Sequence, residues 1–445
     1  MAASTVELET AAGAATGVPS APRLVHIVGG DTLVTVTWAP PSANKTSVAK
    51  YVVTANPSGK TCELTSYFPQ LRCVLTGLKN GTSYTFTVAA LNKKGIGTAS
   101  RPSSKVKVMG LPMSSSVTEI NDPSFDQPGA IVADNSNVWV ANYTGGAYGN
   151  GSISVIKEST GTVTQINDPS IDQPDGIAEN GGVVWVLNSA GGAYGNGSIS
   201  EIDAATGAVT QLNDPSFTFP VGITFDGGYA WVLNASTSTD SNGNEVGSIS
   251  EIDLANGAIT SLASNSFQSV TAITSNGNYV WVADQFGGPG SGAVSKIDIA
   301  TGAVTVISKV SVIHNPIDIA TNGNEVWVTN EGEGLAVSGT TAYLPLIAMI
   351  NPDTDAVSAA YGPLPGDARE TLWEGTSAWF DPAHEYSSSY VDEENIATGQ
   401  VLQLDTIDLT NAAGIAADGT DVWIADNSGG TSGNGYVTKI AESLS

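Results

Sequence analysis

One motif recurs seven times between residue 116 and the C-terminus. A tryptophan flanked by aliphatic residues stands at Trp139, Trp185, Trp231, Trp281, Trp327, Trp379 and Trp423, at spacings of 44 to 52 residues. A full copy reads P-x-G-I, a Gly/Asn turn, V-W-V, a Gly-rich loop, G-S-I-S-x-I-D, T-G and A-V-T-x-I, which predicts four strands and no helix. Four-stranded units with a period of about 45 residues are typical of a β-propeller. The seven copies therefore predict seven blades.

The two ends of this segment predict how the ring closes. The string VTEIN at 117–121 matches the fourth strand of a unit, whereas YVTKI at 436–440 matches the third. We therefore expect the N-terminal strand to complete the last blade, which leaves no open sheet edge. The expected fold class is all-β.

Residues 19 to 110 show a different pattern, in which short alternating runs are separated by turn clusters. The runs lie at residues 33–38, 51–56, 72–78 and 83–91. This spacing predicts an antiparallel β-sandwich. Trp38 falls on an early strand, and Tyr84 follows the Asn80–Gly81 turn, where a tyrosine corner would lie.

This segment resembles a fibronectin type III domain. The residues that carry the resemblance are Pro22, Trp38, Pro40, Pro41, Leu78, Asn80, Gly81, Tyr84, Asn92, Gly95 and Gly97. The resemblance implies a spacer or binding module and names no ligand. We expect a flexible tail at 1–18, the fibronectin type III domain at 19–110, a linker at 111–115 and the propeller at 116–445.

The sequence has two cysteines, Cys62 and Cys73, both in the first unit. Tetrahedral zinc usually takes four ligands, and no partnering histidine lies near this pair. The pair is either a disulfide between neighbouring strands or two buried thiols, and its close spacing favours the disulfide and hence export. The N-terminus lacks the basic start and apolar stretch of a signal peptide, so we expect export to depend on a leader that this sequence does not include. No apolar run approaches the roughly 20 residues of a membrane helix.

The formal net charge of −27 is divided unevenly along the chain. Residues 1–115 hold 11 basic and 4 acidic side chains, and residues 116–445 hold 5 basic and 39 acidic side chains. The first part is thus at +7 and the second at −34. So negative a surface repels phosphate, which argues against a nucleic-acid partner and against an anionic lipid surface. The acidic residues recur blade by blade, as in a solvated shell of a protein outside the cell.

The propeller repeats resemble the YVTN surface-layer repeats, the NHL-type repeats and the streptogramin (virginiamycin B) lyases. VWVTN at 326–330 and GSISEID at 197–203 and 247–253 carry the likeness. The group mixes enzymes with binding proteins. The lyase resemblance implies a divalent metal, Mg²⁺ or Ca²⁺, with Glu ligands three residues after the tryptophans and a catalytic His after the proline of a first strand.

The positions that the lyase resemblance singles out hold other residues. Three residues after each tryptophan stand Asn142, Asn188, Asn234, Asp284, Asn330, Pro382 and Asp426. The positions after the proline, or its equivalent, hold Gly129, Asp175, Val221, Thr271 and Ile317. No catalytic residue is therefore assigned. We expect the Asn/Asp ring to bind nearby backbone N–H groups and the tryptophans to form the core between blades.

Blades five and six depart most from the repeat, and functional sites tend to lie where a regular scaffold departs from its pattern. We expect the loops of these blades to place one group of polar residues on one face. The candidate ligand-binding residues are His314, Arg369, Glu331, Glu333 and Trp373, and the candidate metal ligands are His314, His384, Asp381 and Glu385. Histidine and carboxylates can hold a divalent metal, and an arginine can grip a carboxylate or phosphate. The plainer alternative is ordinary exposed loop residues.

These observations favour an exported or cell-surface protein in which the sandwich presents the propeller as a binding or scaffold module. Its partner would be a protein, a glycan or a small molecule. The alternative is a metal-dependent enzyme, a streptogramin-lyase-like C–O lyase or a hydrolase, acting at the face of blades five and six. A third hypothesis is a component of a cell-surface layer.

Overall fold

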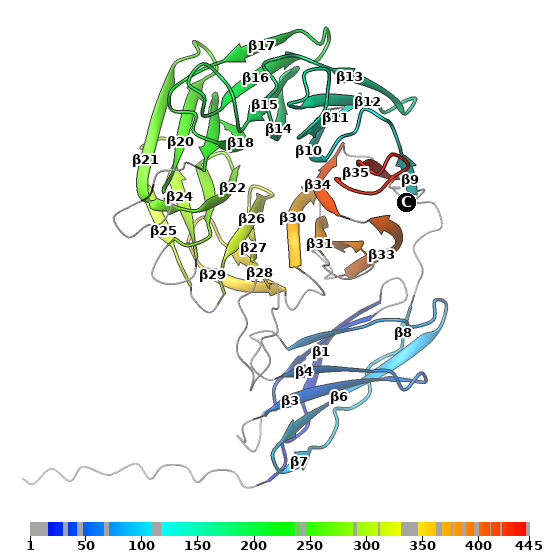
Figure 1. The fold of residues 1–445 in the computed structure, drawn as a ribbon. Coiled ribbons are helices and arrows are strands. Elements are labelled where there is room, and N and C mark those ends of the chain that lie inside the picture. The colour runs from blue at the N-terminus through cyan, green and yellow to red at the C-terminus, as the bar shows by residue number, and fades with distance from the viewer. Residues whose placement is uncertain are drawn as a thin grey trace, which may run out of the picture. The chain divides into compact units, whose positions relative to one another are not determined.

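The computed structural model describes most of the chain. The described residues are 17–29, 34–41, 48–65, 71–108, 117–134, 136–235, 239, 246–287, 292–309, 312–330, 346–361, 367–374, 377–383, 389–395, 400–409, 411–418 and 421–441. The chain divides into two compact units, with the main boundary between Leu111 and Pro112. The regular elements of the described residues are all strands (Figure 1). No helix among these residues is long and apolar enough to cross a membrane.

The first unit is a sandwich of two antiparallel sheets. One sheet contains β1 (Arg23–Gly29), β2 (Val34–Ala39) and β5 (Arg72–Leu75). The other runs β4 (Thr61–Thr65), β3 (Lys50–Asn56), β6 (Ser83–Asn92) and β7 (Gly95–Ile96), and β8 (Val106–Lys107) also pairs with β6. Buried and less buried residues alternate along β3, because successive side chains of a strand point to opposite faces.

Two features of this sandwich confirm expectations from the sequence. The backbone N–H of Lys79 donates to the Tyr84 hydroxyl at 3.1 Å, which is the hydrogen bond of a tyrosine corner. Cys62 and Cys73 form a disulfide. The bond joins β4 to β5 and therefore links the two sheets across the core that contains Trp38 and Tyr51.

The second unit consists of seven four-stranded antiparallel sheets among the described residues. Blades one to three are β10 (Pro128–Ala133), β11 (Asn137–Asn142), β12 (Ser152–Lys157) and β13 (Thr162–Ile166); β14 (Pro174–Asn180), β15 (Val183–Asn188), β16 (Ser198–Asp203) and β17 (Val209–Leu212); and β18 (Pro220–Asp226), β19 (Tyr229–Asn234), β20 (Val246–Asp253) and β21 (Ile259–Gln268). Blades four and five are β22 (Val270–Ser275), β23 (Tyr279–Asp284), β24 (Ala293–Asp298) and β25 (Val304–Ile307), then β26 (Pro316–Thr321), β27 (Val326–Asn330), β28 (Leu346–Ile350) and β29 (Val357–Tyr361).

Blade six is β30 (Asp367–Glu374), β31 (Ser377–Ala383), β32 (Ser389–Asn395) and β33 (Gln400–Leu409).

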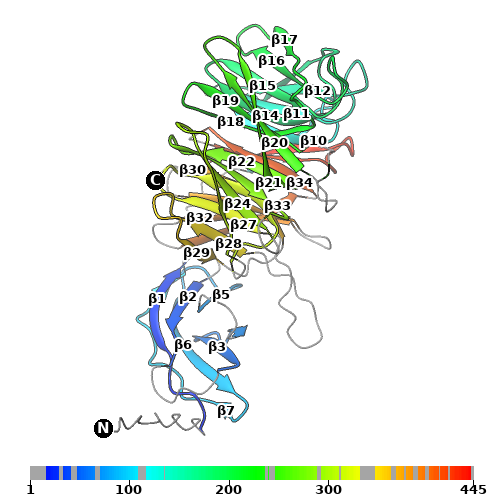
Figure 2. The same ribbon diagram turned by 90° about the vertical axis from the view of Figure 1, so that its left-hand side faces the viewer.

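Blade seven is built from both ends of the propeller sequence. Blade seven joins β34 (Ala412–Ala417), β35 (Asp421–Asp426) and β36 (Tyr436–Ala441) to β9 (Val117–Ile120). The predicted closure by the N-terminal strand is therefore confirmed. The first strand of each blade contacts the first strand of the next, including β10 with β34, so the ring is complete (Figures 1 and 2).

The repeat tryptophans whose side chains are described are buried, and those in the core clusters pack against a neighbouring blade, as expected. Trp139 of blade one is buried with Val184 and Val186 of blade two, and Trp423 of blade seven with Val138 and Val140 of blade one. Such a tryptophan replaces water contacts with contacts to the next blade, which is the main source of stability for such a ring.

The innermost strands pack so closely that the P-x-G-I glycine is required at one junction. A Cβ atom on Gly414 would lie 2.4 Å from the carbonyl oxygen of Gly129, so any other residue would push blade seven away from blade one. This glycine therefore marks a close approach of two backbones rather than a turn.

Candidate functional site

Most of the site predicted on blades five and six lies outside the described residues. Glu331, Glu333, His384 and Glu385 are in this group, and so are the side chains of Arg369, Trp373 and Asp381. Their proposed roles stay predictions.

The backbone nevertheless corrects one expectation. Arg369 and Asp381 were expected in loops, but they lie within β30 and β31. The equivalent residues of blade two, Asp175 and Leu187, also lie within strands, so the first and second strands of a blade extend further toward this face than the repeat pattern predicts.

His314 is the one predicted site residue whose side chain is described. It lies in the connection between β25 and β26 and is partly buried. Its backbone N–H donates to Asn330 Oδ1 at 2.9 Å. In the described part of the chain, no group of three or more His, Cys, Asp or Glu residues could hold a metal ion. The predicted metal set, which also needs His384 and Glu385, is therefore not tested.

The buried Asn/Asp ring has the structural role expected from the sequence. The Oδ1 atoms of Asn142, Asn188 and Asn234 accept backbone N–H bonds at 3.2, 3.0 and 3.2 Å from the connection that precedes their own blade. Their Nδ2 atoms donate to a serine hydroxyl of the third strand at 2.9 to 3.0 Å. These side chains are fully buried and hold strands and connections together, so they are unavailable to a ligand.

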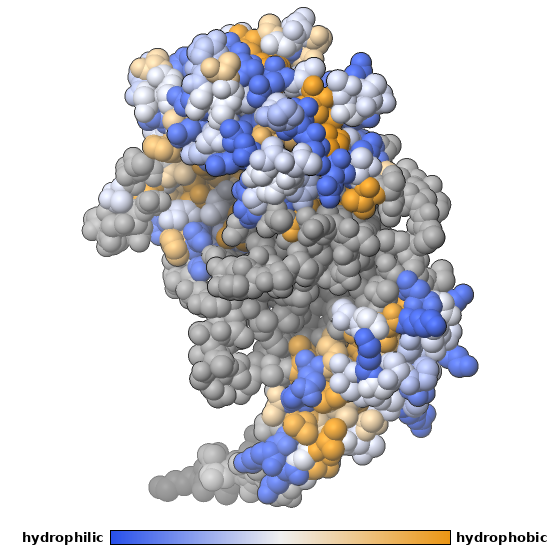
Figure 3. All heavy atoms as spheres, turned by 45° about the vertical axis from the view of Figure 1, so that its right-hand side comes forward, coloured by the Kyte–Doolittle hydropathy of each residue, from blue (hydrophilic) through white to orange (hydrophobic). Residues whose placement is uncertain are grey.

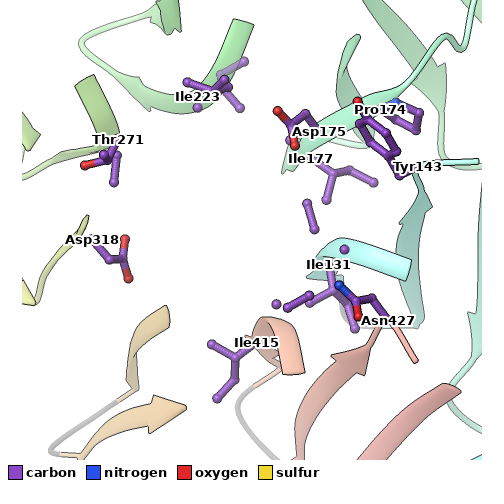
Figure 4. A pocket seen from close by; sticks show the side chains of 18 of the residues that line it. Ile131, Tyr143, Pro174, Asp175, Ile177, Ile223, Thr271, Asp318, Ile415 and Asn427 are labelled. Atoms are coloured by element: carbon purple, nitrogen blue, oxygen red, sulfur yellow. The ribbon is translucent and has the colours of Figure 1, made fainter. Parts of the chain in front are cut away.

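A cavity of about 560 Å³ lies where the first strands of the blades converge (Figure 4). Its described lining comes from blades one to five and blade seven. The cavity thus lies on the axis of the propeller, at the ends of first strands that begin at the connections from the preceding blades.

A β-bulge at the start of each first strand shapes this cavity. The pairing of β14 with β15 shifts between Pro174 and Gly176, and the same shift recurs in the other six blades. A bulge leaves one residue unpaired and re-aims its side chain. In blades two and four the unpaired residues are Asp175 and Thr271, and both line the cavity.

Isoleucine side chains and polar atoms share the wall of the cavity, and the polar atoms contribute the larger part of its accessible surface. The isoleucines come from the last position of P-x-G-I: Ile131, Ile177, Ile223, Ile273 and Ile415. Figure 4 shows several of them around the same central space. Because all of these side chains except Ile415 also pack into the core between blades, this part of the wall is preformed rather than assembled on binding.

Two carboxylates contribute to the polar part of this wall. The Asp175 side chain is exposed within the cavity, and the described residues offer its carboxylate no hydrogen-bond partner. The walls of the cavity partly desolvate this exposed carboxylate, which raises the pKa of Asp175. Asp318 Oδ1 accepts the backbone N–H of Ile319 at 2.8 Å. The described lining contains no Lys, Arg or His.

The rim of the cavity is held in an unusual backbone conformation. Residues just before a first strand adopt left-handed φ values of 43° to 53° without being glycine: Gln127, Gln173, Phe219, Ser269 and Asn315. In the first three blades their N–H groups donate to carbonyls of the preceding blade's Gly-rich loop at 2.6 to 2.9 Å. Such conformations persist only where surrounding contacts enforce them, so the rim is rigid.

The loops around the rim expose aromatic side chains. Tyr148 and Tyr194 are 58% and 56% exposed on the Gly-rich loops of blades one and two, and Phe286 is exposed on that of blade four. On the side drawn in Figure 3, the described surface of the propeller is mainly hydrophilic, with small hydrophobic patches. The rim therefore combines rigid support with accessible Tyr, Asn, Ser and Gly.

Sequence reasoning missed this cavity, although one signal was present. The lyase resemblance singles out the position after the proline for histidine alone, and Asp175 is the acidic exception there among Gly129, Val221, Thr271 and Ile317. The bulge that turns this position toward the axis has no signature in the P-x-G-I pattern itself.

Comparisons with known proteins identify both halves of the chain by fold. Residues 20–106 match the fibronectin type III domain family. A region of the chain is 32% identical over 108 residues to Protein sidekick-1 of Mus musculus, which is 22% of this chain and 5% of that protein. The chain thus spans only about a twentieth of this curated relative, so the likeness concerns the domain and not the whole protein.

Solved β-propellers resemble the second unit. The WD40 domain of Neurospora crassa Pan2 has a TM-score of 0.52 at 12% identity, covering 74% of this chain and 96% of that one. An oligogalacturonate lyase in complex with manganese has a TM-score of 0.53 at 10% identity, covering 75% and 95%. The β-propeller domain of the Trilobed protease from Pyrococcus furiosus has a TM-score of 0.51 at 8% identity, covering 71% and 93%.

At such identities these structures support the fold alone. The fibronectin type III domain and the propeller are thereby established. The finer resemblance to YVTN, NHL and streptogramin-lyase repeats stays a prediction.

Proposed function

We propose that this chain is an extracellular or cell-surface binding protein, in which a fibronectin type III domain presents a seven-bladed propeller whose axial cavity and rim bind the ligand. The disulfide between Cys62 and Cys73 supports an oxidising compartment, because such bonds are rare where thiols are kept reduced. The matches to a fibronectin type III domain and to sidekick-1 support a surface protein.

The observation that carries the proposal is the preformed cavity of about 560 Å³. Ligand sites of proteins are typically concave, about 300–1,000 Å³ in volume, largely apolar and fitted with a few polar groups. The isoleucines together with Asp175, Thr271 and Asp318 give the cavity both apolar contact area and polar groups, with a larger polar share than in a typical ligand site. Rigid backbone under loops of Tyr, Ser, Gly and Asn also suits recognition, because these residues combine large contact area with adaptable hydrogen bonding.

A variant that fills the cavity tests the proposal. A Cβ atom on Gly129 would meet no heavy atom within 4 Å, so Gly129→Trp should fill the cavity without disturbing the packing of β10. Ala205→Trp, in the exposed turn between β16 and β17, is the matched control. Amino-acid derivatives, sugars and peptides are screened by thermal shift on the full chain.

A cavity ligand at 100 times its Kd should stabilise the wild type and Ala205→Trp by about 2.7 kcal/mol and leave Gly129→Trp unchanged. Ligands that stabilise all three proteins equally would contradict binding in the cavity. Separately, two titratable thiols in freshly purified, denatured and non-reduced protein would contradict the export argument.

The metal-dependent enzyme stays the alternative that the sequence raised. Among its candidate residues only the His314 side chain is described, and the manganese-bound lyase is similar in fold alone. Stoichiometric metal that is lost in both His314→Ala and His384→Ala would favour it.

A further inference from the structure

Asp175 carries a carboxylate at a position where the other blades hold other residue types. The equivalent residues are Gly129, Val221, Thr271 and Ile317 in blades one, three, four and five, and Arg369 in blade six. The Asp175 side chain is exposed within the cavity, and described residues give its carboxylate no hydrogen bond. An exposed carboxylate in a concave site, without a partner from the protein, is available to a cationic ligand.

Further acceptors lie across the same space from Asp175, on β22 and β26 (Figure 4). Asp318 stands on β26, at a position that is glycine or alanine in blades one to four. The Thr271 hydroxyl donates its hydrogen to the carbonyl of Pro316 at 3.1 Å, which leaves its oxygen free to accept. An ammonium group has three donors and no acceptor, so it suits a cavity whose described lining holds two carboxylates and no Lys, Arg or His.

The remainder of the wall suits the stem that carries such a group. Ile177, Ile223 and Ile273 would contact methylene groups, and long cationic side chains often bury an aliphatic stem against apolar surface. The charge of residues 116–445, with 39 acidic and 5 basic side chains, attracts cations to the whole unit.

From these observations we infer that the axial cavity is a site for a primary ammonium group on an aliphatic chain, of the lysine side-chain type, with Asp175 as its main anionic contact. This inference rests on the proposed function, since it names the ligand class of the same cavity.

Lysine side chains could come from another molecule or from a second copy of this chain. The fibronectin type III domain has Lys93 and Lys94 exposed at the turn between β6 and β7, next to Ile96, which is 57% exposed. That turn presents ammonium groups beside apolar surface, which is the chemistry that the cavity would recognise.

The test is calorimetric titration of the full chain at low ionic strength with Nα-acetyl-lysine methylamide. Nα-acetyl-norleucine methylamide, which lacks the charge, and Nα-acetyl-glutamate methylamide, which reverses it, are the comparison probes. We expect saturable 1:1 binding of the lysine probe, weaker binding of the other two by about tenfold or more, and a loss of affinity as salt screens the charges. Asp175→Asn should weaken the lysine probe by about tenfold, whereas Glu119→Gln, an equal loss of charge on the outer strand β9, should not.

Three results would overturn the inference. These are equal affinity for the norleucine probe, a preference for the glutamate probe, and unchanged lysine affinity in Asp175→Asn. If one of these three results is found but Gly129→Trp abolishes the binding of an uncharged ligand, the proposed function stands and only the ammonium inference fails. If Gly129→Trp alters the binding of no ligand, both fail.

Sedimentation of the full chain separates the two sources. Self-association that the lysine probe competes away, and that Lys93→Gln/Lys94→Gln removes, identifies a second copy as the ligand. A monomeric chain that still binds the lysine probe assigns the site to a lysine of another molecule.

Discussion

Ile120 of β9 pairs with Val437 of β36, although the two residues lie near opposite ends of the propeller sequence. Beside them, the backbone N–H of Thr431 donates to Asn121 Oδ1 at 2.9 Å. Ile120 also packs against the core that contains Trp423 and Val138. The integrity of the ring, and with it the shape of the axial cavity, therefore depends on this short strand.

We predict that Ile120→Asp destabilises the propeller by about 3 kcal/mol, because it places an unpaired carboxylate against that apolar core. Thr118→Asp introduces the same group at an exposed position of β9 and should change stability by no more than about 0.5 kcal/mol. Thermal unfolding followed by calorimetry measures both. Equal effects of the two substitutions would show that β9 does not close the ring as described.

Among the buried Asn and Asp residues three positions after the tryptophans, Asp284 is the one whose substitution we expect to stabilise the propeller. Ser295 Oγ donates to its Oδ2 at 2.6 Å, but Oδ1 has no partner among the described residues. Burial raises the pKa of Asp284 well above its usual range, although hydrogen bonds from Ser295 oppose the shift. The free energy of unfolding therefore falls as pH rises above the unfolded pKa of about 4. Above that pH the unfolded carboxyl group ionises in water, whereas the buried one either stays protonated or ionises without full solvation.

Asp284→Asn should accordingly raise the stability at pH 8 by about 1–3 kcal/mol and have little effect near pH 4. Asp426→Asn is the matched control at the equivalent position of blade seven. It should bring no such gain, because the Asp426 carboxylate accepts N–H bonds from Asn411 and Ser428. Melting temperatures measured across this pH range check the prediction, and a gain that persists unchanged at pH 4 would contradict it.

Glu158 makes the junction between blades one and seven sensitive to pH. Burial, then the nearby carboxylates of Asp418 and Asp134, raise the pKa of Glu158 from 4.5 to about 7, and Asp421 adds to this while Lys439 opposes it. Lys439 is itself paired with Asp421 at 2.7 Å. The protonated form of Glu158 fits this acidic surrounding better than the charged form.

The stability of the propeller should therefore fall as pH rises from about 4.5 to about 7 and then level off. We expect Glu158→Gln to remove this decline and to add roughly 1 kcal/mol at pH 8, a modest gain because the side chain is partly solvated. Glu119→Gln at an exposed position is the control. Denaturant unfolding at several pH values measures the effect, and an unchanged pH profile in Glu158→Gln would refute it.

Removing the disulfide should weaken only the fibronectin type III domain. Cys62 and Cys73 are 11 residues apart, and closing a loop of this length contributes about 2–3 kcal/mol. We expect Cys62→Ala/Cys73→Ala to lower the unfolding temperature of the sandwich and to leave that of the propeller unchanged. Calorimetry of the full chain resolves the two transitions. A shift of the propeller transition alone would contradict the prediction that the disulfide stabilises the sandwich.

The repeat made most of the fold predictable from the sequence. Each tryptophan marks the second strand of a blade, because only a large apolar side chain fills the space between neighbouring sheets, as Trp139 does against Val184 and Val186. The VTEIN string predicted closure because its residues follow the pattern of a fourth strand. The tyrosine corner at Tyr84 followed from its distance to the Asn80–Gly81 turn.

The binding site was harder to predict than the fold. Asp175 reaches the axis because of a bulge, which arises from backbone pairing and not from residue type. Arg369 was expected in a loop, yet it lies within β30 at the position equivalent to Asp175, because the first strand of a blade already begins at the proline position before it. Isoleucine in P-x-G-I predicts a buried strand, but not that its side chain also faces a cavity.

The central claim is that a cationic side chain enters the axial cavity, and a crystal structure of the full chain with Nα-acetyl-lysine methylamide tests it most directly. The account predicts the ammonium group within hydrogen-bond distance of the Asp175 carboxylate and its methylene groups against Ile177 and Ile223. A ligand bound only at the loops of blades five and six, with the cavity free of it, would contradict the account.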